Sequence, residues 1–355
     1  MDSTVSSTPS TLPSPSARPA TSPSAGTARP APRGGEPLAL VVGASRGLGL
    51  LCAEQLIQHG HRVVLSSRSQ ESLEAARAQL LAEHPEATVD IAPCDVSDRH
   101  AVTALVEGVE RDLGPIEVLL TVAGIIQVGP AQAMTLEHFD QAVGTMLMGP
   151  VNVTMQVLPH MRQRGRGRIG TVTSVGGKVA PPHLLPYSTA KFGAVGFSEG
   201  LTAELAGTGV TATTIVPGLM RTGSHDAALF TGDAAREFAW FGPSASLPLL
   251  SMDAERAAER MVHGVLEGHT HVMLTPVTQV GSRVHGLAPS FTTRLMGLVN
   301  RVLPGAEAVD PLGPGTTVEG RVARQGLRGR ARRVVDALTT LGDRAGESTN
   351  ERTAR

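Results

Sequence analysis

Short apolar runs alternate with stretches of helical periodicity from Leu38 onward, and this alternation constrains the fold more than any other feature of the chain. The pattern is typical of β-α-β units, in which a parallel strand is followed by a crossover helix. Seven runs fit strands, namely 38–42, 62–66, 88–93, 116–121, 168–173, 210–216 and 271–274. The sequence therefore predicts an α/β fold: one doubly wound parallel sheet with helices on both faces and a ligand crevice at the carboxyl ends of the strands.

The two ends of the chain differ from this central part. Residues 1–36 are rich in Ser, Pro, Ala and Thr without apolar periodicity, so we expect a disordered extension. Residues 37–275 form the expected domain, and 276–355 are interpreted as a helical extension with a mobile tail, since 321–333 hold six arginines and no acid. Residues 291–303 carry an apolar stripe, which is more typical of core or oligomer packing than of a membrane-surface helix.

The overall charge points to no macromolecular partner. The formal net charge is −1, which gives no general attraction to nucleic acid or to an anionic membrane. No run of about 18 apolar residues suggests a membrane span. The chain has two cysteines, Cys52 and Cys94, and they form no CxxC pair. We therefore expect the protein in the reducing cytoplasm rather than in an oxidising compartment. We expect a small-molecule ligand and a homodimer or homotetramer.

A glycine-rich turn follows the first apolar run. Its residues, spaced as GxxxGxG, are Gly43, Ala44, Ser45, Arg46, Gly47, Leu48 and Gly49. Glycine lets the backbone approach a pyrophosphate, and the N-terminus of the following helix presents free N–H groups to an anion. Tight turns also need glycine for structural reasons alone. The position between the first strand and the first helix nevertheless favours a dinucleotide site.

The end of the second predicted strand indicates which dinucleotide is bound. Ser67 and Arg68 stand where a carboxylate would accept a hydrogen bond from the 2′-hydroxyl of a ribose. Arg68 and Arg46 could instead bind a 2′-phosphate through charge-assisted hydrogen bonds. The alternative is that both are ordinary surface arginines. We predict NADP(H) as the cofactor in preference to NAD(H).

The catalytic candidates include the only tyrosine of the chain and one of its two lysines. Tyr187 and Lys191 lie four residues apart, on one face of a helix. An adjacent ammonium favours phenolate and lowers the pKa of the phenol, as acid–base catalysis near neutral pH requires. Ser174 ends the run 168–173 and reaches the same crevice. We interpret these three residues as catalytic, against the alternative of an accidental surface pair.

Two other chemistries are disfavoured. No GxSxG nucleophile elbow surrounds Ser174, which argues against a serine hydrolase. The twelve histidines show no metal-ligand spacing, so we expect no metal.

Taken together, these motifs resemble the short-chain dehydrogenase/reductase family, in its branch with the shorter glycine spacing, over about residues 37–275. The resemblance implies a Rossmann-type fold and hydride transfer between NADP(H) and a carbonyl or secondary alcohol. It implies that Tyr187 is the acid/base, that Lys191 binds the nicotinamide ribose and that Ser174 orients the substrate oxygen. It further implies cofactor contacts from Asp95, Val96, Ala123, Gly124, Pro217, Gly218 and Thr222.

The sequence also departs from the family pattern. Met146 stands where the family has an asparagine that holds a water relay behind the lysine, and Asn152 is too far around the helix to replace it. An alternative function is therefore an NADP(H)-binding sensor or scaffold that does not turn over. A nucleotide-sugar epimerase or dehydratase would favour the other glycine spacing.

The segment 219–250, which covers the substrate in the family, suggests the substrate class. It holds aromatic and leucine side chains: Phe230, Phe238, Trp240, Phe241, Leu247, Leu249 and Leu250. They suggest an apolar, medium-to-large substrate, although internal packing or a dimer contact would explain them equally well.

Overall fold

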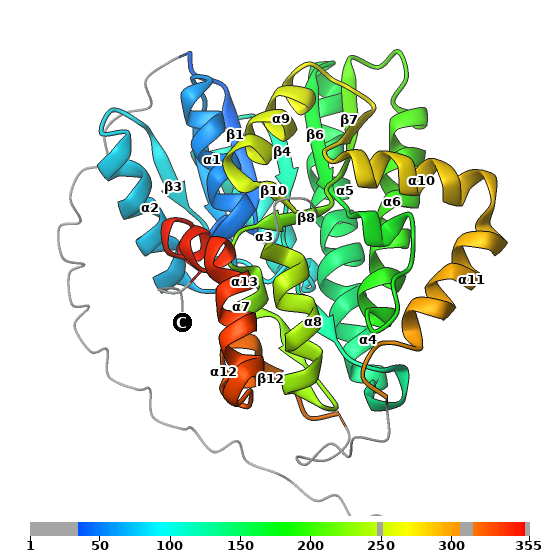
Figure 1. The fold of residues 1–355 in the computed structure, drawn as a ribbon. Helices are drawn as coiled ribbons and strands as arrows, with labels where there is room; N and C mark the ends of the chain where they lie inside the picture. The colour runs from blue at the N-terminus through cyan, green and yellow to red at the C-terminus, as the bar shows by residue number, and fades with distance from the viewer. Residues whose placement is uncertain (1–34, 247–250, 306–314, 352–355) are drawn as a thin grey trace, which may run out of the picture. The chain divides into compact units, whose positions relative to one another are not determined.

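A seven-stranded parallel sheet is the centre of the computed structural model, which describes residues 35–246, 251–305 and 315–351 (Figure 1). The strands are β1 (Leu38–Val42), β2 (Arg62–Ser66), β3 (Val89–Ile91), β4 (Ile116–Thr121), β6 (Gly167–Val172), β7 (Val210–Val216) and β11 (His271–Met273). Every predicted run overlaps one strand of this sheet, so the predicted fold class is confirmed.

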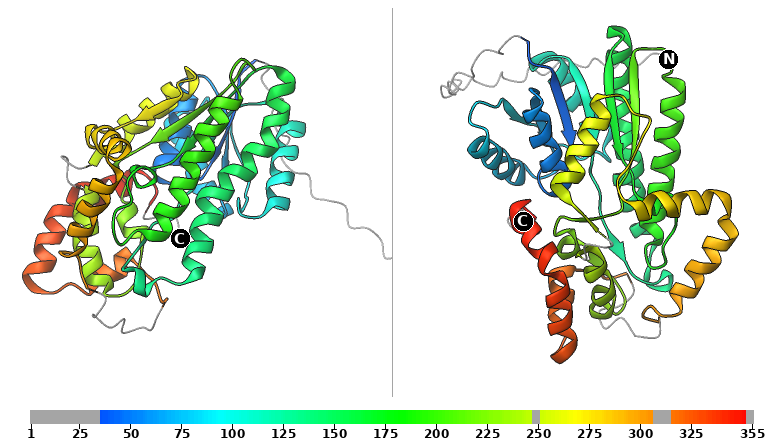
Figure 2. Two further views of the ribbon diagram at one scale, coloured as in Figure 1. Left: turned by 90° about the vertical axis from the view of Figure 1, so that its right-hand side faces the viewer. Right: turned by 45° about the horizontal axis from the view of Figure 1, so that its top comes forward.

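Helices cover both faces of the sheet (Figure 2). One face packs against α1 (Gly47–Gln58), α2 (Gln70–Glu83) and α9 (Ala254–Leu266). The other packs against α3 (Arg99–Asp112), α5 (Gly149–Arg164) and α6 (Leu185–Glu204). Successive side chains of a strand point to opposite faces, so β1 directs Val41 into the first layer and Leu40 into the second. Burial on both faces explains why the strands are continuous apolar runs.

The strand order places the ligand crevice. It runs β11-β7-β6-β4-β1-β2-β3, so the chain proceeds outward from β1 to β3 and then returns to β4 on the other side of β1. In open α/β sheets, ligands bind outside the carboxyl ends of the strands at such a reversal. The glycine-rich turn follows β1 directly and lies at this position.

Short elements lie beyond the carboxyl ends of the main strands. They are β5 (Gln127–Val128), β9 (Leu229–Phe230) and β12 (Val318–Glu319), which form one small sheet, and β8 (Leu219–Arg221) with β10 (Ser251–Asp253), which form another. Nearby helices are α4 (Leu136–Val143), α7 (Ser224–Ala227) and α8 (Ala234–Ser246). The sequence did not predict these five strands, because a segment of two or three residues shows no periodicity of its own, and none of them lies in one of the seven predicted runs.

The apolar stripe of residues 291–303 is not part of the core. It lies on α11 (Pro289–Asn300), which follows α10 (Pro276–Leu287), and the two helices lead away from the sheet in Figure 1. Phe291, Leu295 and Leu298 are exposed. Within the described residues α11 meets chiefly α10, so the stripe does not pack into the core of this chain, and oligomer packing stays a prediction. No helix in the described parts of the chain has both the length and the apolar character needed to cross a membrane.

The arginine-rich segment is helical, and five of its six arginines are exposed, as expected for a solvated segment. It forms α12 (Gly320–Gln325) and the start of α13 (Gly329–Ser348), and both helices pack against α8. Arg324 is the exception, because it is half-buried and its guanidinium donates to Asp336 at 2.7 Å and to Asp343 at 2.9 Å. The division into domains at 275/276 stays a prediction, and residues 1–34 of the expected extension lie outside the described residues.

Candidate active site

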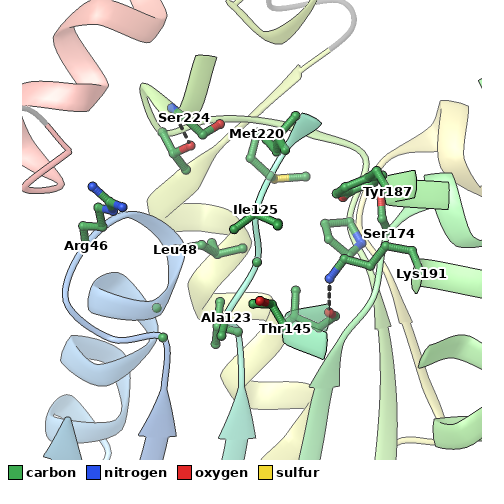
Figure 3. Close-up of a pocket in the computed structure, with 18 of the residues that line it drawn as sticks. Arg46, Leu48, Ala123, Ile125, Thr145, Ser174, Tyr187, Lys191, Met220 and Ser224 are labelled. Carbon is green, nitrogen blue, oxygen red and sulfur yellow. Dashed lines mark hydrogen bonds between the residues drawn. The ribbon is translucent and has the colours of Figure 1, made fainter. Parts of the chain in front are cut away.

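A cavity of about 750 Å³ occupies the crevice at the carboxyl ends of the strands (Figure 3). Most of the residues predicted from sequence line it: Gly43, Ser45, Arg46, Leu48, Gly49, Ser67, Arg68, Asp95, Val96, Ala123, Gly124, Ser174, Tyr187, Lys191, Pro217, Gly218 and Thr222. Gly47 is the predicted residue that does not, because residues near the end of the chain cover it.

In the glycine turn, backbone segments lie so close together that only glycine fits at two positions. Gly43 has φ +89°, in the left-handed region, and a Cβ there would overlap the backbone of Ala123. A Cβ on Gly49 would overlap the carbonyl of Gly43. The N–H groups of Gly43 and Ala44 both donate to Ser66 O, at 2.7 and 3.1 Å. These contacts bring the ends of β1, β2 and β4 together and leave the first turn of α1 facing the cavity through Leu48.

Polar side chains gather at the end of the cavity formed by β2. Asp95 accepts hydrogen bonds from the N–H and the hydroxyl of Ser97, at 2.9 and 2.7 Å. These bonds, together with the charge of Arg68, lower the pKa of Asp95, so this carboxyl is ionised at neutral pH. The Ser67 hydroxyl is buried without a hydrogen-bond partner among the described residues.

Ser174, Tyr187 and Lys191 meet at the opposite end, as Figure 3 shows. Ser174 follows β6, and its hydroxyl accepts from the Gly176 N–H at 3.0 Å, which orients the side chain. Tyr187 and Lys191 lie on the first turns of α6, and Ser174 forms a hydrogen bond with the Tyr187 hydroxyl. The Lys191 ammonium donates to the carbonyl of Val172 at 2.8 Å. One strand end and one helix thus bring the three predicted residues together.

The electrostatics of this group differ from the expectation in one respect. Burial raises the pKa of Tyr187 above its usual range, and the hydrogen bond from Ser174 offsets only part of this rise. The expected lowering by Lys191 is absent, since its Nζ lies 6.0 Å from the centre of the phenol ring and is directed to Val172. Burial also lowers the pKa of Lys191 to about 8, because a charged amine loses its hydration there.

Met146 fills an apolar space behind Tyr187. It lies in a turn of π-helix (Gly144–Met148) between α4 and α5, a type of turn frequent at functional sites. Its side chain is 1% exposed and packs with Ala142 and Ala190. Asn152 points elsewhere and donates to the carbonyl of Val96 at 2.9 Å. The structure thus brings no described amide to the position of the missing asparagine.

The aromatic residues of the segment 219–250 divide into two groups. Trp240 and Phe241 line the cavity, whereas Phe230 and Phe238 are fully buried behind them. All four belong to one apolar cluster, of which Phe241 is a buried member and against which Trp240 packs. The three leucines Leu247, Leu249 and Leu250 lie outside the described residues. Sequence reasoning missed the buried pair that supports Trp240, in which His183 contacts Glu237 at 2.8 Å.

A second set of missed residues comes from the segment 349–351, after α13. Glu351 lines the cavity, and the Gly47 N–H donates to the carbonyl of Thr349 at 2.7 Å. Thr349 and Glu351 carry no motif, so only the folded chain shows that they belong to the site.

The comparisons with known proteins agree with this geometry. The family model described as short chain dehydrogenase matches residues 37–229. A putative ketoacyl reductase from Streptomyces coelicolor is 39% identical over 187 residues, which cover 52% of this chain and 71% of the relative. Gluconate 5-dehydrogenase from Gluconobacter oxydans is 35% identical over 184 residues, with the same shares covered.

A solved structure extends the likeness to three dimensions. Actinorhodin polyketide ketoreductase with NADPH has a TM-score of 0.60 and 30% identity, over 68% of this chain and 97% of that one. It contains the form of the cofactor that the sequence predicts here. The chain belongs to the short-chain dehydrogenase family and is an oxidoreductase that acts on a CH–OH/C=O pair with a nicotinamide dinucleotide.

Proposed function

We propose that this enzyme transfers a hydride between NADP(H) and an apolar carbonyl or secondary alcohol. The observation that carries the proposal is that one cavity is lined by both the predicted cofactor-binding arginines and the predicted catalytic residues. Arg46 and Arg68 lie toward one end of it, and Ser174, Tyr187 and Lys191 meet at the other. A dinucleotide that spans the cavity would place its phosphorylated ribose near the arginines and its nicotinamide near the tyrosine.

The residues present fit such a cofactor. Gly43 and Gly49 line the cavity, where a glycine backbone lets a pyrophosphate approach the turn at the N-terminal end of α1. The buried Ser67 hydroxyl, unpaired among the described residues, offers a hydrogen bond beside Arg68 to a ribose phosphate. Asp95 would accept from the adenine amine, and Pro217, Gly218 and Thr222 would border the nicotinamide.

The mechanism assigns one task to each catalytic residue. When bound, the nicotinamide supplies or accepts the hydride. Ser174 holds the substrate oxygen by a hydrogen bond, and Tyr187 gives its phenolic proton to that oxygen in reduction or takes the proton in oxidation. Lys191, which is charged below about pH 8, would bind the nicotinamide ribose and supply positive charge at this end of the cavity. Its bond to the Val172 carbonyl fixes the position of the ammonium.

The substrate end supports an apolar compound. Trp240, Phe241, Ile125 and Met220 line the cavity and offer mainly apolar contact. A panel of carbonyl compounds, followed at the NADPH absorbance band, tests both the reaction and the substrate class. We expect lipid-like or polycyclic ketones to be reduced faster than small sugars, and the reverse order would reject the apolar assignment.

The same assay distinguishes catalysis from a second candidate, a sensor that holds NADP(H) without turnover. The observation that favours the sensor is Met146 in place of the relay asparagine. Tight NADPH binding with no oxidation by any compound of the panel would establish the sensor, whereas turnover excludes it.

We further propose a cytoplasmic homodimer or homotetramer. Leu185 and Phe192 on α6 and Met155 on α5 are exposed, together with the stripe on α11, and a second copy would cover such apolar area. Cys52 and Cys94 are buried and free, as expected in a reducing compartment. Light scattering on the purified protein measures the oligomeric state.

A further inference from the structure

Residues 349–351 connect two walls of the cavity, and we call this segment the clasp. The carbonyl of Thr349 accepts from the Gly47 N–H at 2.7 Å, and the Asn350 amide donates to the carbonyl of Ser45 at 2.9 Å. The Thr349 hydroxyl donates to the carbonyl of Thr222 at 2.9 Å. The clasp therefore joins the glycine turn to Thr222, the residue after β8, across the region where the pyrophosphate of the cofactor would lie.

The clasp places a carboxylate against the phosphate cradle. The Glu351 side chain is 9% exposed, and its Oε2 lies 3.6 Å from Nε of Arg46. A Cβ on Gly47 would be 2.7 Å from Oε1 of Glu351, so the carboxyl group lies directly on the turn. Oε2 accepts no hydrogen bond from the described residues. Burial and the nearby Asp226 disfavour the charged form of Glu351, whereas Arg46 and His225 favour it, and burial is the largest of these effects.

This carboxylate and the cofactor need the same positive groups. The N-terminus of α1 and Arg46 are where we place the phosphates of NADP(H), and the Glu351 carboxylate already pairs with Arg46 there. The cavity keeps its volume of about 750 Å³ with Glu351 as part of its wall. A dinucleotide bound at the turn would therefore meet the negative charge of Glu351, and protonation of the Glu351 carboxyl would remove that repulsion.

We propose that Glu351 is a specificity residue of the cofactor cleft, whose negative charge competes with the phosphates of the dinucleotide for Arg46 and whose carboxyl takes up a proton when the dinucleotide binds. This inference rests on the proposed NADP(H) site. Arg46 is one of the two arginines assigned to the 2′-phosphate, which only NADP(H) carries. The charge of Glu351 should therefore weaken the binding of NADP(H) more than that of NAD(H).

The first test compares Glu351→Gln with Glu347→Gln, which removes a charge from an exposed position on α13. Dissociation constants for NADPH and NADH are measured at pH 8 by nucleotide fluorescence. We expect Glu351→Gln to lower the Kd for NADPH by roughly fivefold or more, within the usual range of coupling between two sites, and the Kd for NADH by less. Glu347→Gln should match the wild type, and Arg46→Ala should abolish the gain from Glu351→Gln.

The second test measures how many protons the protein takes up when NADPH binds. Calorimetry of NADPH binding in two buffers of different ionisation enthalpy should show proton uptake in the wild type and less uptake in Glu351→Gln. Equal NADPH affinity in the wild type and Glu351→Gln, or proton release, overturns the inference. If Glu351→Gln does not fold, Glu351→Ala must show the same gain. If the wild type and both Glu351 variants bind neither nucleotide, the proposed function fails instead.

Discussion

The Glu237 carboxylate holds Trp240 in the wall of the substrate end, accepting a hydrogen bond from the indole Nε1 at 2.7 Å. The same carboxylate contacts Nδ1 of His183 at 2.8 and 2.9 Å. His183 has φ +64°, in the left-handed region that disfavours residues other than glycine, so the pair helps to hold a strained turn next to α6. A buried carboxylate thus determines both the position of an aromatic side chain and the shape of the loop before Tyr187.

Glu237→Gln should weaken the contacts that hold Trp240 and His183 in place. The amide keeps the size of the side chain, but it presents a donor to one of its two partners, so we expect a loss of about 1–3 kcal/mol in stability. KM for a bulky substrate should rise more than kcat falls, because Trp240 lines the proposed substrate end and would contact the substrate away from the reacting atoms. Thermal unfolding and steady-state kinetics measure both effects, with Glu259→Gln, at an exposed position of α9, as the control. Unchanged KM would show that Trp240 is held by other contacts.

Tyr187→Phe should remove nearly all turnover while NADPH still binds. The substitution deletes only the hydroxyl that transfers the proton, and the ring keeps its contacts. Steady-state rates and a fluorescence titration of NADPH provide the two measurements. Substantial remaining activity would place the acid/base on another residue.

The pH profile of carbonyl reduction should fall as the pH rises through about 8. Burial lowers the pKa of Lys191 to about 8, so its ammonium is present below this pH and is lost above it. The raised pKa of Tyr187 keeps the phenol protonated over the same range. In Lys191→Arg, whose guanidinium stays charged, the overall rate should be lower and the fall near pH 8 should disappear. The same fall in that variant would assign it to a different group.

Arg68→Ala should weaken NADP(H) binding more than NAD(H) binding, because only NADP(H) carries the 2′-phosphate that the guanidinium would bind. Arg99→Ala, at an exposed position at the start of α3, is the matched control. Equal losses for both nucleotides, or a wild-type preference for NAD(H), would reject the cofactor assignment.

Met146→Asn should lower stability by about 1–3 kcal/mol, because it buries an amide among alanines and the ring of Tyr187. Met155→Asn, on the exposed side of α5, should change stability little. Melting curves compare the two variants. A Met146→Asn protein of wild-type stability with faster turnover would show instead that the amide restores a water relay.

The sheet could be predicted because each main strand is buried on both faces and therefore forms a continuous apolar run, as in Leu38–Val42. The catalytic group could be predicted for a different reason. Ser174 and Lys191 are placed by one strand end and one helix, and their separation along the chain is short enough for a motif.

The remaining features depend on contacts that no local pattern reveals. The stripe containing Phe291 and Leu295 has the period of a buried helix, yet the described residues do not cover it. Arg324 belongs to an arginine-rich run that the sequence predicts to be solvated, but its guanidinium donates hydrogen bonds to Asp336 and Asp343 on α13. Glu351 lines the cavity only because the segment after α13 folds onto the glycine turn.

The bond between Asn350 and Ser45 joins residues 305 positions apart. During synthesis the N-terminal part of a chain emerges first and can begin to fold before the rest is made. The glycine turn therefore leaves the ribosome long before the clasp exists. A nascent chain that has not yet reached the clasp would present the nucleotide site without the Glu351 carboxylate, so its affinity for the cofactor would change once the clasp is made and docks on the turn.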